Sequence, residues 1–150
     1  MQFMNVSRQE AEKVFIVVEN NEGAELIPGV VCEMSITATD ADQGHLVEKV
    51  DVAVNATTGI AAPVAGVVDS TIASGGVGRL QVYGPATVRA SAALHTGRLA
   101  VATSAGVAPT GVVTADVQTT TPTAAYARAS LGFCLENVNA TQARVQLQLM

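Results

Sequence analysis

Short runs of alternating apolar and polar residues recur along the chain, and each run predicts a β-strand. Between Val30 and Ile36 every second residue is apolar, whereas Glu33 and Ser35 fall on the opposite face. A period of two is typical of a strand with one buried face. Similar runs predict strands over residues 14–18, 47–54, 64–70, 77–83, 87–91, 99–103, 112–117, 127–135 and 143–149.

Turn-forming residues separate these runs. The segments Asn20 to Gly23 and Pro28-Gly29 predict turns, because Asn and Gly accept a positive φ. The segment Ala73 to Gly76 predicts the turn of a hairpin. Gly84-Pro85 predicts the end of the strand before it, because proline cannot donate a hydrogen bond to a neighbouring strand.

The regular alternation of short strands and turns predicts an all-β fold. We expect a single-domain β-barrel or sandwich of short strands over residues 13–150, preceded by an extended N-terminal arm over residues 1–12. In this arm, Ser7 and Glu10 have the spacing of a capping box, which favours a single helical turn. Chain ends are often poorly ordered, so an unstructured arm is the alternative.

The arm is too short to add much to a core, yet it carries apolar residues that would gain from burial against a partner. Phe3, Met4 and Val6 are apolar, and Arg8 is charged. We therefore expect contacts with another protein through Phe3, Met4, Val6 and Arg8.

Two segments share one pattern of residues. Gly66-Val67-Val68 is followed, after a polar turn, by Gly78 to Val82, which contains Arg, an apolar residue, Gln and another apolar residue. Gly132 to Leu135 is followed in the same way by Ala143 to Leu147. Two equivalent hairpins of one barrel and two hairpins of merely similar composition both fit this pattern.

Charged residues are few and scattered. They make up 14% of the chain, the net charge is −5, and the only lysines are Lys13 and Lys49. Nucleic-acid binding needs clustered cations that displace counterions from phosphates, so we expect no nucleic-acid partner. No apolar stretch approaches the roughly 20 residues of a membrane span, so we expect no membrane partner.

The sequence offers little for catalysis or for metal binding. The only histidines, His45 and His95, lie in predicted turns without a nucleophile motif beside them. Asp40 to Gly44 is spaced somewhat like a calcium loop, but His45 stands where such a loop needs Gly. Gly75 to Gly78 lies between predicted strands, whereas phosphate-binding loops precede a helix. We therefore expect no enzyme activity, no cofactor and no metal.

The two cysteines, Cys32 and Cys134, lie far apart in the sequence. The first residues lack the basic region and apolar run of a secretory signal peptide. Disulfides are typical of exported proteins, so we expect two buried thiols that are not bonded to each other.

A hairpin from Gly66 to Gly84 is followed by an extended segment, a strand over residues 99–101 and a small turn at Ser104 to Gly106. A second hairpin begins at Ala129 and ends with Arg144 to Leu149. This order resembles the capsid decoration, or cement, proteins of tailed bacteriophages. The turn at residues 137–141 departs from the pattern, because it lacks the expected Gly.

The resemblance implies a structural virion protein that binds the exterior of the assembled phage capsid and stabilises it. The implied partners are the major capsid protein and further copies of the chain, most simply as a homotrimer. The implied location is the capsid surface of the virion, after synthesis in the host cytoplasm. The alternative is another virion β-protein, such as a tail or head-fibre attachment component. Under either function, Phe3, Met4, Val6 and Arg8 are the candidate capsid contacts.

Overall fold

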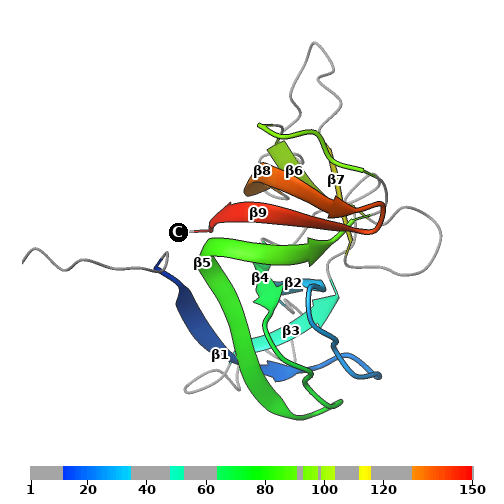
Figure 1. The fold of residues 1–150 in the computed structure, drawn as a ribbon. Helices are drawn as coiled ribbons and strands as arrows, with labels where there is room; N and C mark the ends of the chain where they lie inside the picture. The colour runs from blue at the N-terminus through cyan, green and yellow to red at the C-terminus, as the bar shows by residue number, and fades with distance from the viewer. Residues whose placement is uncertain are drawn as a thin grey trace, which may run out of the picture.

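The structure, a computed structural model, describes residues 12–34, 48–52, 64–90, 93–97, 99–103, 112–115 and 130–149, and every helix or strand assigned in these ranges is a β-strand (Figure 1). The strands are β1 (Val14–Asn20), β2 (Val31–Met34), β3 (Glu48–Val52), β4 (Val64–Val68), β5 (Val77–Arg89), β6 (Leu99–Thr103), β7 (Val112–Ala115), β8 (Ser130–Asn139) and β9 (Gln142–Gln148). Each overlaps a segment predicted from the sequence, although β8 continues to Asn139, beyond its predicted end at residue 135.

Five strands close into a small barrel. The sheet runs β1-β3-β2-β4-β5, and an additional antiparallel pairing between β5 and β1 completes the ring. Within this ring only β1 and β3 run parallel. The same sheet continues from β5 through β9, β8 and β6 to β7 and forms a second, curled wall beside the barrel (Figure 1). The predicted all-β fold is therefore confirmed.

Strand β5 joins the two parts, and here one prediction is wrong. Gly84-Pro85 does not end the strand, because β5 continues for 13 residues to Arg89. Its first half pairs with β1 and β4, whereas residues from Tyr83 onward pair with β9. Gly84, with φ of 91°, and Pro85 thus lie where the strand changes partners. Residues 87–89 of the expected separate strand belong to β5.

The chain buries two hydrophobic clusters on opposite faces of one wall. Side chains alternate along a strand, so Cys32 and Val68 join the cluster inside the barrel, while Val31 and Val67 join a cluster between the barrel wall and the second wall. We call these the barrel core and the outer core. The barrel core contains Val18, Leu26, Val30, Cys32, Ala65, Val68, Ile72 and Leu80. The outer core contains Val31, Val67, Ala86, Val88, Ala90, Leu94, Ala100, Leu131, Cys134, Ala143, Val145 and Leu147.

The turn after β1 is held by a buried side chain. The Nδ2 group of Asn20 donates hydrogen bonds to the carbonyl oxygens of Ala24 (2.8 Å), Ile72 (3.0 Å) and Ala73 (3.1 Å). Its Oδ1 accepts from the backbone N–H of Glu22 at 2.8 Å. The predicted turn is present, but among the described residues only glycines have a positive φ. Asn20 therefore stabilises the turn through hydrogen bonds of its side-chain amide, and not by adopting a left-handed backbone conformation.

Both predicted hairpins form, but in different parts of the fold. Strands β4 and β5 are antiparallel neighbours in the barrel, and β8 and β9 are antiparallel neighbours in the second wall. In the turn of β8–β9, the Asn139 Oδ1 accepts the backbone N–H of Thr141 at 2.8 Å. This hydrogen bond supports a turn that lacks the expected Gly.

Candidate functional site

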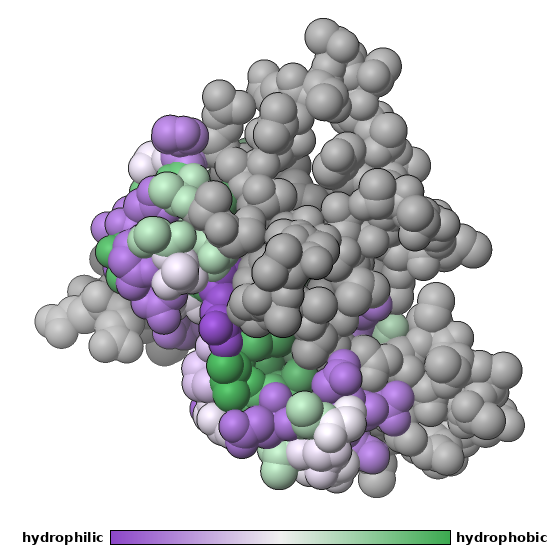
Figure 2. Space-filling view, turned by 90° about the vertical axis from the view of Figure 1, so that its right-hand side faces the viewer, coloured by the Kyte–Doolittle hydropathy of each residue, from purple (hydrophilic) through white to green (hydrophobic). Residues whose placement is uncertain are grey.

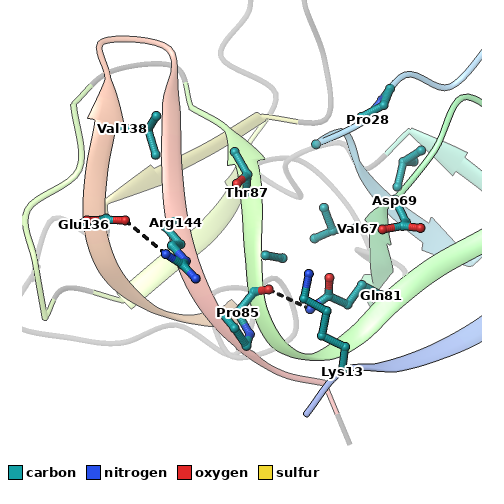
Figure 3. Close-up of a pocket in the computed structure, with 13 residues that line it drawn as sticks. Lys13, Pro28, Val67, Asp69, Gln81, Pro85, Thr87, Glu136, Val138 and Arg144 are labelled. Atoms are coloured by element: carbon teal, nitrogen blue, oxygen red, sulfur yellow. Dashed lines mark hydrogen bonds and ion pairs between the residues drawn. The ribbon is translucent and has the colours of Figure 1, made fainter. Parts of the chain in front are cut away.

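A groove of about 380 Å³ lies where the barrel meets the second wall (Figure 3). We call it the β5 groove, because β5 contributes Gln81, Pro85, Ala86 and Thr87 to it. The side chains of Glu136, Val138 and Arg144 border it on the β8–β9 side, and Pro28 and Asp69 border it on the other. Lys13, Gly29, Val67 and Val68 complete the lining.

Backbone hydrogen bonds fix the loop before β2 against the groove. The N–H of Gly29 donates to the Val68 carbonyl, and the Gly29 carbonyl accepts from the N–H of Arg89, both at 2.9 Å. Gly29 has φ of 84°, which other residues rarely adopt. The predicted Pro28-Gly29 turn is thus confirmed, and it holds Pro28 at the edge of the groove.

Gln81 is the buried polar residue of the groove and is only 4% exposed. Its Nε2 group donates to the carbonyl oxygens of Tyr83 and Pro85, each at 3.0 Å. Two carbonyl acceptors can be satisfied only by the amide nitrogen, so they determine which way the amide points. No described residue donates a hydrogen bond to the remaining Oε1 atom, which is left available to the groove.

Two ion pairs flank the groove. Arg79 contacts Asp69 at 2.7 Å, and Arg144 contacts Glu136 at 3.5 Å. All four side chains are at least partly exposed, so each pair adds at most about 1 kcal/mol to stability. Among the described residues, Lys13 is the lining cation without an ion-pair partner. The groove therefore has one uncompensated positive charge in a protein of net charge −5.

Apolar side chains are exposed on two other parts of the surface. On β8, Phe133 is 48% and Val138 is 50% exposed. On the barrel, Val17 of β1 and Val77 of β5 are 53% and 62% exposed. On the face seen in Figure 2, apolar surface also lies in a hollow bordered by hydrophilic residues. Large exposed apolar patches mark interaction sites, so these positions are candidate contacts with other chains.

No protein-family model and no curated protein sequence matches the chain. Its structure is similar to that of the N base of head fibre gp8.5 of bacteriophage phi29. The TM-score is 0.54 at 14% sequence identity, and the match covers 91% of this chain and 95% of that one. The match extends over nearly the whole of both chains and shows that they share a fold.

Several residues singled out in the sequence lie outside the described residues. These are the contact candidates Phe3, Met4, Val6 and Arg8, together with His45 and the segment Asp40 to Gly44. His95 is described, and its side chain is exposed in a turn, as expected. No group of three or more His, Cys, Asp or Glu residues in the described part of the chain could hold a metal. Within the same ranges, no helix is long and apolar enough to cross a membrane.

The β5 groove was not predicted from the sequence. Gln81 alternates with Leu80 and Val82 and looks like an outward-facing strand residue. Its burial comes from strands and loops that are distant in the sequence. The position of Gln81 between the apolar residues Leu80 and Val82 is the one sequence feature that points to it.

The cysteines lead to a prediction about reactivity. Cys32 is in the barrel core and Cys134 in the outer core, and both are free thiols. Burial raises the pKa of the Cys134 thiol above its usual value, which keeps the thiol protonated and a poor nucleophile. In the native protein, both cysteines are expected to react slowly with a thiol reagent. In urea-unfolded protein, both are expected to react rapidly. A mass lower than expected by two hydrogen atoms under non-reducing conditions would show a disulfide between the two cysteines and would contradict the prediction.

Proposed function

We propose that the protein is a structural component of a tailed-phage head that binds the outer surface of the assembled capsid. The observation that carries the proposal is the fold shared with a head-fibre base over 91% of this chain. The resemblance of the segments between Gly66 and Leu149 to decoration proteins supports the same location from the sequence. The major capsid protein is the proposed partner, and the proposal assigns no catalytic activity.

The decoration role has a simple physical basis. A protein that binds only the assembled shell stabilises that shell by mass action. Many identical weak contacts around a symmetric particle add up to tight overall attachment. A decoration protein is therefore expected to raise the temperature at which capsids break open, as measured by release of packaged DNA.

A base for a head fibre is the second candidate, favoured by the name of the structural neighbour. A fibre base needs to bind the shell and a further protein, and it does not need to reinforce the shell. In that case the protein would cosediment with capsids while their disruption temperature stays unchanged. Cosedimentation together with the heating experiment therefore separates the two roles, and absence of cosedimentation would contradict both.

The N-terminal arm is the proposed attachment segment, through Phe3, Met4, Val6 and Arg8. Deletion of residues 1–11 is expected to leave the barrel folded and to abolish capsid occupancy. Glu12 should be kept, because its backbone carbonyl approaches Gly84 of β5 closely. Circular dichroism and cosedimentation measure the two properties. Full occupancy after the deletion would move the attachment surface onto the barrel or the second wall.

We also propose a homotrimer, in which contacts between copies cover the exposed apolar side chains. Val17, Val77 and Phe133 are each about half exposed, and exposed apolar surface of this kind gains from burial between chains. Sedimentation is expected to give a mass of three chains at micromolar concentration in the absence of capsid. A stable monomer under these conditions would contradict a preformed trimer.

A further inference from the structure

We propose that the β5 groove binds an extended acidic peptide segment of the partner protein. The inference rests on the proposed function, which supplies a protein shell as the partner. Three features of the groove carry it: a solvent-reached hydrogen-bond acceptor on the otherwise buried Gln81, an uncompensated cation and exposed apolar side chains at the rim.

The acceptor is the Oε1 atom of Gln81. The side chain is 4% exposed, and its nitrogen is already held by the carbonyls of Tyr83 and Pro85. No buried side-chain N or O atom of the described residues lacks a hydrogen-bond partner, so this Oε1 atom is reached by solvent, and a ligand N–H can replace water on it. An extended peptide presents backbone N–H groups at regular intervals and fits this requirement.

The cation is Lys13, whose side chain extends into the same space beside Gln81 (Figure 3). Arg144 is paired with Glu136, and Asp69 is paired with Arg79, so these charges are already compensated. A carboxylate placed near Lys13 would compensate the remaining charge. This favours Asp or Glu in the ligand over Lys or Arg.

The rim offers apolar contacts on both sides. Val138 is 50% exposed on the β8 side, and the side chain of Pro28 is exposed on the opposite side. The groove volume of about 380 Å³ is at the low end of the roughly 300–1,000 Å³ of ligand sites. A short segment that alternates apolar and acidic residues therefore matches the groove.

The test is an NMR titration of the full chain with a capped pentapeptide of sequence Val-Asp-Val-Asp-Val. We expect saturable shifts of the Gln81 side-chain NH₂ signals and of residues that line the groove. The matched peptide Val-Asn-Val-Asn-Val should bind about fivefold more weakly, because the pairing with Lys13 is lost. Sodium acetate, as a free carboxylate, should bind more weakly still, because it cannot reach the rim.

Two variants make the test specific. Lys13→Gln should weaken binding of the acidic peptide about fivefold and remove its preference over the Asn peptide. Thr96→Glu changes the net charge by the same amount at an exposed turn and should leave binding unchanged. Absence of saturable shifts at Gln81, equal binding of both peptides, or equal binding of acetate would overturn the proposal. The titration contains no capsid, so its failure is distinguishable from a failure of capsid binding.

Discussion

Replacement of Gly132 by alanine is expected to lower the free energy of unfolding by roughly 3 kcal/mol or more. Gly132 lies within β8, paired with Ala100 of β6 on one side and Leu147 of β9 on the other. Its φ of 146° is one that residues with a side chain rarely adopt. An added Cβ would also overlap the backbone carbonyl oxygen of Gln146. Either β9 must move away from β8 or the strand must change conformation, and both disturb the outer core.

Urea unfolding measures this effect, with Gly23→Ala as the matched control. An added Cβ at Gly23 would meet no atom within 4 Å, and its φ is not positive. The control is expected to change stability by less than about 1 kcal/mol in either direction. Equal unfolding midpoints for both variants would show that β8 and β9 do not approach each other as described.

Leu80→Ala is expected to cost roughly 2–5 kcal/mol, because it removes buried methyl groups and leaves a cavity in the barrel core. The side chain of Leu80 is 0% exposed. Its Cβ also lies against Gly66 of β4, where an added Cβ would come within 2.8 Å. This close contact between two barrel strands leaves little freedom for the surroundings to collapse into the cavity.

Thr71→Ala is the control for this variant. Thr71 is exposed before the Ala73 to Gly76 turn and outside the proposed contacts, so its truncation is expected to change stability by no more than about 0.5 kcal/mol. Thermal unfolding followed by circular dichroism gives both values. An unchanged melting midpoint for Leu80→Ala would mean that Leu80 does not face a closed barrel core.

The strands were predictable because alternation and turn residues act locally. Residues 31–34 form a strand as predicted, although Val31 and Cys32 are both buried, so both faces are covered there, and the Ala73 to Gly76 turn connects β4 and β5 as predicted. Val67, Ile72, Leu80 and Val82 of this hairpin are all buried, although Val67 lies in the outer core and Ile72 and Leu80 lie in the barrel core. The residue types along each strand are sufficient to determine these features.

The failures come from contacts between distant segments. Gly84-Pro85 looks like a strand end, yet β5 continues because β9, which is far away in the sequence, pairs with its second half. Gln81 looks exposed by alternation, yet the elements around the β5 groove bury it. Local patterns carry no information about which strand covers which face, so neither the groove nor the shared role of β5 could be predicted.

The central claim is that the protein binds the outside of a phage capsid, and cryo-electron microscopy of reconstituted particles tests it most directly. Capsids that lack the protein would be mixed with the purified chain, and with the chain lacking residues 1–11 as a control. We predict added density at regular positions on the outer capsid surface, into which the barrel and second wall fit, and loss of that density with the deleted chain. An unchanged outer surface at saturating protein concentration would contradict the claim.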